Sequence, residues 1–113
     1  MIRPLLWIGS AKADLTEFPR VVKALFGHAL YEIQGGETPD CARPLSQFGG
    51  GVYELRDEYD TNAYRCVYVV RLRKGVYVLH AFMKKSKSGR AMPRQNIGLI
   101  EERLKRAREH DRT

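Results

Sequence analysis

Apolar residues spaced three and four positions apart between residues 20 and 34 form the clearest pattern in the chain. This spacing places them on one face of an α-helix. Pro19 suits the first position of that helix, because proline lacks the N–H that would be unpaired there. Gly35-Gly36 is expected to end it, since glycine accepts the left-handed conformation of a C-cap. The core-facing stripe comprises Val22, Leu25, Phe26, Ala29, Leu30 and Ile33.

Two further helices are predicted, one just before this helix and one near the C-terminus. A short helix runs from Ala11 to about Phe18, with Ser10 as its N-cap and acidic side chains near its positive end. A last helix begins at Pro93, after a basic loop from Lys84 to Met92. Its apolar stripe consists of Ile97, Ile100, Leu104 and Ala107.

Four segments have the composition of β-strands. Arg3–Ile8 is short and apolar, and Pro4 near its start favours an edge position. Val52–Asp57 alternates in polarity, and Tyr64–Leu72 is β-branched and aromatic throughout. A tight turn at residues 73–75 leads from that strand into Val76–Met83.

The predicted order is therefore βααβββα, an α+β fold with two N-terminal helices and a C-terminal helix. The short connections between the last three strands predict an antiparallel sheet. A chain of 113 residues is long enough for one core, so residues 1–113 are expected to form a single domain. Gly36–Gly51 has no sustained period and is expected to be a loop, with Leu45 and Phe48 anchoring it to the core.

Charge is distributed unevenly along the chain. Between Thr61 and Ile100 there are nine Lys or Arg residues and no Asp or Glu, whereas the rest carries 11 basic and 13 acidic side chains. The whole excess of the net charge of +7 therefore belongs to one segment of 40 residues. Such an asymmetry favours a polyanionic partner, because phosphate neutralisation supplies affinity that is independent of sequence. The alternative is a solvated basic face that only keeps the protein soluble.

Cysteine content and hydropathy narrow the possible classes of protein. Cys41 and Cys66 have no neighbouring ligand pair, so neither a metal site nor another cofactor is expected, and Cys66 is predicted to be a small core residue. No apolar run approaches the roughly 20 residues that span a bilayer, and no signal peptide opens the chain. These features predict a cytoplasmic protein with no membrane partner.

Three motifs carry a family resemblance. They are GGGVYELR at Gly49–Arg56, YRCVYVVR at Tyr64–Arg71, and VYVLHAFMKKS at Val76–Ser86. Together with the order of elements, they resemble the RelE/HigB superfamily of toxins, specifically its phage-derived Gp49-like branch. The resemblance implies the toxin of a type II toxin–antitoxin pair. Relatives cut messenger RNA on the ribosome without a metal, and a cognate antitoxin, commonly of the helix-turn-helix type, neutralises them.

The resemblance also implies which residues act. Metal-free RNA cleavage uses the substrate's own 2′-OH as nucleophile, so the protein must align the chain and stabilise charge on the phosphorane. Arg56 matches the phosphate-contacting arginine of RelE-like enzymes, and Lys84 and Lys85 match their basic pair. The remaining candidates for binding RNA phosphates are Arg65, Lys87, Arg43 and Arg90.

The general acid and base are less well defined by the sequence. His80 has a suitable unperturbed pKa, but it alternates with Val78 and Phe82 on one strand face, which almost equally favours a structural histidine. Glu54 shares a strand face with Arg56 and could act as a base or orient that arginine. A scheme in which Lys84 or Lys85 stabilises charge or donates protons needs neither of these groups. RelE carries a tyrosine shortly after its basic pair, and this chain has none after Tyr77, so its acid–base arrangement must differ.

Two other functions are compatible with this fold. One is a ParE-like toxin that inhibits DNA gyrase, against which the basic cluster argues because such toxins need no nuclease site. The other is a phage accessory protein that binds nucleic acid without cleaving it. Charge asymmetry does not distinguish this second alternative from an enzyme.

Overall fold

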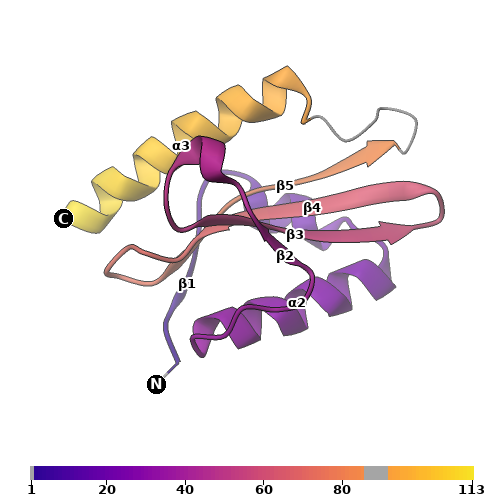
Figure 1. Cartoon of the computed structure of the whole chain (residues 1–113), viewed down its shortest axis with the longest axis horizontal. Helices are drawn as coiled ribbons and strands as arrows, with labels where there is room; N and C mark the ends of the chain where they lie inside the picture. The colour runs from indigo at the N-terminus through magenta and orange to yellow at the C-terminus, as the bar shows by residue number, and fades with distance from the viewer. Residues whose placement is uncertain (1, 86–91) are drawn as a thin grey trace.

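The computed structural model describes residues 2–85 and 92–113. Their elements occur in the order strand, two helices, short strand, 3-10 turn, three strands and helix (Figure 1). The elements are β1 (Leu5–Trp7), α1 (Ala11–Thr16), α2 (Arg20–Gln34), β2 (Ala42–Pro44), η1 (Ser46–Phe48), β3 (Val52–Tyr59), β4 (Asn62–Val69), β5 (Val76–Lys85) and α3 (Arg94–Arg112).

The strands form one five-stranded sheet in the order β1-β5-β4-β3-β2. This confirms the α+β fold and the antiparallel meander of β3, β4 and β5. The edge strand β1 departs from the antiparallel pattern, because it pairs parallel with β5 after a long crossover. The expectation of a structureless loop at Gly36–Gly51 is wrong at β2, whose three residues are too few to show an alternating pattern.

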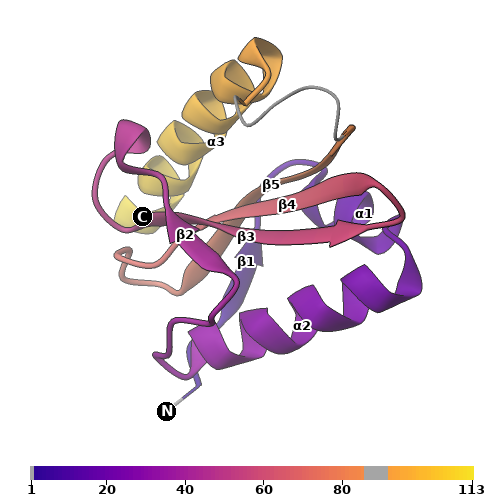
Figure 2. The same ribbon diagram turned by 45° about the vertical axis from the view of Figure 1, so that its right-hand side comes forward.

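Helices cover both faces of the sheet, with α1 and α2 on one side and α3 on the other (Figures 1 and 2). Two hydrophobic cores result. The predicted stripe of α2 is buried in the first core except for Leu25, which is 40% exposed. Cys66 lies fully buried in that core, as expected, and burial raises the pKa of its thiol to about 12. The second core contains Ile100, Leu104 and Ala107 of α3.

A β-bulge in β5 changes which side chains face α3. Val67 of β4 lies opposite His80, but the next residue, Tyr68, lies opposite Val78, so Leu79 is an extra residue in β5. A bulge interrupts the alternation of side chains along a strand. Val78 packs in the core of α1 and α2, whereas Leu79 and Phe82 pack against α3. The prediction that Val78 and His80 share a face is therefore wrong.

Ser10 occupies the N-cap position of α1 as predicted, but its side chain makes no hydrogen bond to the helix backbone. Its hydroxyl donates to Asp14 Oδ2 at 2.7 Å and accepts from Nη2 of Arg103 in α3 at 3.0 Å. The neighbouring Gly9 has φ of +58°, and a Cβ there would lie 2.9 Å from the Arg103 side chain. The turn before α1 is thus shaped to admit an arginine from the opposite end of the chain.

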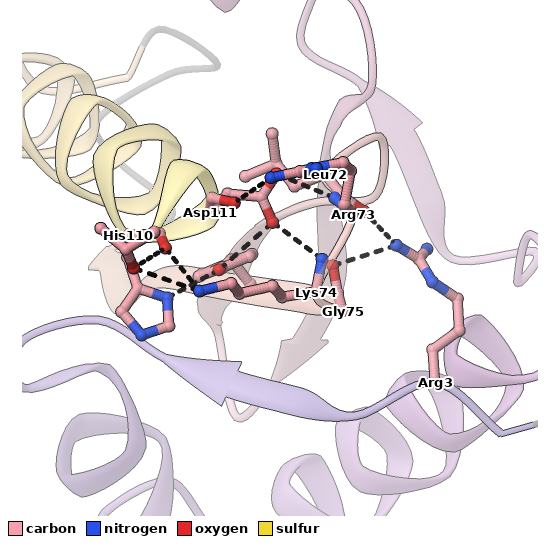
Figure 3. A network of polar contacts seen from close by, with 9 residues as sticks. Arg3, Leu72, Arg73, Lys74, Gly75, His110 and Asp111 are labelled. Atoms are coloured by element: carbon pink, nitrogen blue, oxygen red, sulfur yellow. Dashed lines mark hydrogen bonds and ion pairs between the residues drawn. The ribbon is translucent and has the colours of Figure 1, made fainter.

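The C-terminal end of α3 is fastened to the turn between β4 and β5 (Figure 3). Asp111 accepts the backbone N–H groups of Arg73 at 2.9 Å and Lys74 at 2.8 Å. Lys74 Nζ donates to the carbonyl of His110 at 3.1 Å. Arg3 contacts the same turn and donates hydrogen bonds to the carbonyls of Leu72 and Gly75 (Figure 3). These contacts hold α3 against the sheet.

The bond from the Arg73 N–H is the main cause that lowers the pKa of Asp111, and the Lys74 N–H adds to it against the opposing effect of burial. A carboxyl whose pKa is lower in the folded chain stabilises the fold above its unfolded pKa of about 3.9. That contribution is lost as the pH falls through the folded pKa.

We expect Asp111→Asn to lower the melting temperature at pH 7 and to lower it less at pH 3. Melting curves at both pH values measure this, with the exposed Glu109→Gln of the same helix as control. An equal loss at both pH values would contradict the expectation.

Candidate functional site

Strands β3, β4 and β5 bring four polar residues together on the face that α3 covers. Arg56 lies directly opposite Arg65, and Arg65 lies opposite Phe82. Glu54 is two residues before Arg56 on the same strand face, and Lys84 is two residues after Phe82. The strand register thus gathers three of the predicted phosphate-binding cations around one carboxylate.

Glu54 connects two of these cations. Its Oε1 lies 3.5 Å from Nε of Arg65, and its Oε2 lies 3.4 Å from Nε of Arg56. Glu54 and Arg65 are buried, whereas the Arg56 side chain is 36% exposed. A carboxylate that pairs with two guanidinium groups restricts their rotamers. Glu54 therefore has the geometry for one of its two predicted roles, the orientation of Arg56.

Burial shifts the pKa values of Glu54 and Lys84 in opposite directions. Burial raises the pKa of Glu54, although the charges of Arg65, Arg56 and Lys84 oppose the rise. Burial also lowers the pKa of Lys84, and the neighbouring charges of Arg65 and Arg56 lower it further. A carboxylate with a raised pKa is a better base, and an ammonium with a lowered pKa is a better acid. Arg65 remains charged although burial lowers its pKa, because arginine titrates far above neutral pH.

Three residues of the cluster, Glu54, Arg65 and Lys84, line a pocket of about 350 Å³. Apolar side chains from the segment before η1, from β5, and from α3 with the residues just before it line the same pocket. A largely apolar pocket with a few convergent polar groups is the usual form of a ligand site. Its lining residues are Leu45, Gln47, Glu54, Arg65, Phe82, Lys84, Met92 and Ile97.

His80 lies beside this pocket and is engaged at both ring nitrogens. Nε2 lies 2.7 Å from Oδ1 of Asn96, and Nδ1 lies 3.4 Å from Nη1 of Arg103. Arginine only donates, so Nδ1 must accept and the ring proton must be on Nε2. The ring stacks on Phe82 with centroids 5.0 Å apart. This geometry matches a structural histidine, which is one of the two roles that the sequence left open for His80.

We expect His80 to be neutral and in the Nε2–H form at pH 7. Burial is the main cause that lowers its pKa, and the charge of Arg103 acts in the same direction while the bond to Asn96 opposes it. Two-dimensional ¹H–¹⁵N spectra of the imidazole distinguish the two tautomers and the protonated ring. His28, whose side chain is 73% exposed, provides the internal control. A protonated His80 ring at pH 7 would contradict this assignment.

Two other predicted site residues, Lys85 and Arg43, do not join the cluster. Lys85 follows Lys84 on a regular part of β5 and is exposed, so its side chain points to the opposite face. Arg43 lies opposite Glu54 in the register, but its Nη1 donates to the carbonyls of Asp40 and Ala42. The remaining two candidates, Lys87 and Arg90, lie outside the described residues.

Several residues of the site were not predicted from the sequence. Arg103 was detectable, because it interrupts the apolar spacing of Ile100, Leu104 and Ala107 on the buried face of α3. Its Nη1 donates to the carbonyl of Leu79 at 3.0 Å, and its Nε has no hydrogen-bond partner among the described residues. Gln47 and Asn96 carry no signal of this kind, because only the folded chain places them at the site.

In the described part of the chain, no group of three or more His, Cys, Asp and Glu side chains could hold a metal ion. None of the helices within residues 2–85 and 92–113 is long and apolar enough to cross a membrane.

The chain has the fold of the E. coli toxin RelE. The chain aligns with a solved structure of a mutant of the E. coli toxin RelE in the free state, with a TM-score of 0.59 at 18% sequence identity. The alignment covers 94% of this chain and 98% of that one. Residues 13–105 match the family described as phage derived protein Gp49-like, and the chain belongs to that family, as its motifs predicted. A search of curated proteins returned no significant match.

Proposed function

We propose that this chain is the toxin of a type II toxin–antitoxin pair and cleaves messenger RNA on the ribosome without a metal. The observation that carries the proposal is the set of Arg56, Arg65 and Lys84 around the buried carboxylate of Glu54, which lines a pocket together with Arg65 and Lys84. The RelE-like fold and the Gp49-like family support it. A cognate antitoxin of the helix-turn-helix type and mRNA in the ribosome are the proposed partners, and the cytoplasm is the proposed location.

In the proposed reaction, the 2′-oxygen of the substrate attacks the adjacent phosphorus. Glu54 takes the proton of the 2′-OH, and Lys84 gives a proton to the departing 5′-oxygen. The phosphorus–oxygen bond to the 5′-oxygen breaks, which leaves a 2′,3′-cyclic phosphate and a 5′-OH. The raised pKa of Glu54 and the lowered pKa of Lys84 suit these roles. Arg56 and Arg65 stabilise the charge that develops on the phosphorane oxygens.

Arg56 tests the proposal directly because it is partly exposed and its removal should leave the fold intact. We expect Arg56→Ala to lower the rate of translation-dependent mRNA cleavage by about 10²-fold, the usual cost of losing one charge-stabilising donor. Primer extension on an mRNA in a reconstituted translation system measures the cleavage. Arg20→Ala, an exposed arginine on α2 at the opposite face, is the matched control and should cleave normally.

Three outcomes separate the proposal from its alternatives. Cleavage by wild type and control but not by Arg56→Ala supports the enzyme. Inhibition of gyrase supercoiling without RNA cleavage would favour a ParE-like toxin. RNA binding without cleavage or gyrase inhibition would favour the accessory protein.

A further inference from the structure

The β-bulge in β5 determines which of two adjacent lysines belongs to the charged cluster. Val78 packs in the core of α1 and α2, and Leu79 is the extra residue that follows it. In a strand without the bulge, every second residue after Val78 would share its face, and Lys84 would lie on the side of α1 and α2. Lys85 would then lie on the α3 side, with the cluster. Because of the bulge, it is Lys84 that lines the pocket and Lys85 that is exposed.

The pattern of apolar residues along β5 is compatible with either pairing. Ala81 and Met83 are apolar and alternate with Phe82, so both faces of the strand carry apolar side chains. Helices cover both faces of the sheet (Figures 1 and 2). A slip of one residue moves a complete set of side chains from one face to the other. A contact that recognises the extra residue is therefore needed to fix the bulged pairing.

Arg103 of α3 makes this contact. Its Nη1 donates to the carbonyl of Leu79 at 3.0 Å and lies 3.4 Å from Nδ1 of His80. Both acceptors belong to the bulge, where the ladder of the sheet is interrupted. Arg103 is buried, and a buried charged donor that loses its acceptors is costly to the fold. The arginine therefore stabilises the bulged pairing over the regular one.

The guanidinium group of Arg103 is also fixed from the side of α1. Its Nη2 donates to the hydroxyl of Ser10 at 3.0 Å, and that hydroxyl donates to Asp14. Gly9 leaves the space that the arginine occupies, because a Cβ there would lie 2.9 Å from Nε. These contacts hold the guanidinium between α1 and α3, so that it does not follow β5 when the strand slips.

We infer that Arg103 is a positioning residue, which holds the bulge at Leu79 and so selects Lys84, and not Lys85, as the lysine of the cluster. Arg103 acts through the backbone of β5 and not on the substrate. The effect on cleavage rests on the proposed function, in which Lys84 gives a proton to the departing 5′-oxygen. The effect on strand pairing does not depend on that function.

The first test measures strand pairing and needs no RNA. Cross-strand NOEs are compared by NMR in wild type, Arg103→Met and the control Arg106→Met, which removes an exposed arginine of α3. Wild type and control should show Val67 of β4 in contact with His80, its partner in the structure. Arg103→Met should show Val67 in contact with Leu79, its partner when the extra residue enters the regular ladder. A folded Arg103→Met chain with the wild-type contacts alone would overturn the inference.

Two further variants separate the bulge contact from folding. Arg103→Lys replaces Arg103→Met if the latter does not fold, because it keeps the charge but its single nitrogen cannot bond to Leu79, His80 and Ser10 together. The regular pairing should then appear beside the bulged one, and its absence would count against the inference. Ser10→Ala removes a bond that does not reach the bulge and should keep the wild-type pairing.

The second test determines which lysine the cleavage depends on. Lys84→Met and Lys85→Met are each combined with Arg103→Met and assayed by primer extension. Arg103→Met alone should lower cleavage by about 10²-fold, the usual cost of displacing a reacting group. The remaining activity should fall further with Lys85→Met, which has little effect in the wild-type chain.

The outcomes distinguish this inference from the proposed function. If Arg103 only stabilised the fold, Arg103→Met would lower cleavage without making it sensitive to Lys85→Met, and the selection of Lys84 would be disproved. If the strand pairing changes as expected but wild type does not cleave RNA, the proposed function falls and the role of Arg103 in pairing stands.

Discussion

Lys84→Met is expected to reduce mRNA cleavage by about 10²- to 10³-fold, whereas Lys85→Met should leave it within a factor of about two. The two lysines are adjacent and chemically identical, but only Lys84 is buried in the cluster with Glu54 and Arg65. Lys85 is exposed on the opposite strand face. The pair therefore compares one charge at the site with the same charge outside it.

The comparison is made with the primer-extension assay under translating conditions, together with melting curves for both variants. Methionine keeps most of the length of the lysine side chain, so a folded Lys84→Met chain is expected. Equal losses in the two variants would show that net charge, and not the cluster, drives the activity. Normal cleavage by Lys84→Met would remove Lys84 from the proposed mechanism.

Arg65→Met is expected to destabilise the fold by about 3 kcal/mol at pH 7, the usual cost of leaving one partner of a buried ion pair behind. Arg65 and Glu54 are both buried, with their side chains 10% and 9% exposed. Without Arg65, the Glu54 carboxylate keeps the more exposed Arg56 at 3.4 Å and the positive charge of Lys84. Urea unfolding at pH 7 measures the loss.

The pH dependence of this loss has a defined sign. The pKa of Glu54 is already raised in the folded chain, and removing Arg65 raises it further because a favourable charge is gone. A group with a raised folded pKa destabilises the fold when it must ionise, and this cost disappears below the unfolded pKa of about 4.3. The deficit of Arg65→Met should therefore shrink between pH 7 and pH 4.

A double variant separates stability from catalysis. Arg65→Met with Glu54→Gln removes both charges of the pair, so most of the stability should return. Cleavage should not return, because both the proposed base and a phosphate ligand are missing. Recovery of cleavage in the double variant would show that the pair is structural only.

Local periodicity explains why the secondary structure was predictable. The apolar stripes of α2 and α3 repeat at helical spacing, and the long strands are rich in β-branched and aromatic residues. These features act over a few residues, so they do not depend on the rest of the fold. The short β2 and the parallel pairing of β1 with β5 depend on contacts between distant segments, and a single sequence contains no local signal for them.

The site could be predicted in part for the same reason. Alternation along β3 correctly placed Glu54 and Arg56 together, because no irregularity interrupts the pairing of β3 with β4. The same rule correctly placed His80 beside Phe82, but it failed between Val78 and His80, because the bulge at Leu79 changes the face that the following residues occupy. Pairing between strands creates the bulge, so it is a property of the sheet and not of the segment.

By itself, the sequence determined the class of fold, the basic segment, the family and the set of charged residues from which a site could be built. Only the tertiary structure decided that Lys84 and Arg65 share Glu54 while Lys85 points away, and that Arg103 and Asn96 hold His80. It also placed Gln47 and four apolar side chains in the lining of the pocket that Glu54, Arg65 and Lys84 share. The physical reason is that charge and hydrophobic periodicity are local properties of the sequence. Burial and strand register arise only when distant strands and α3 pack together.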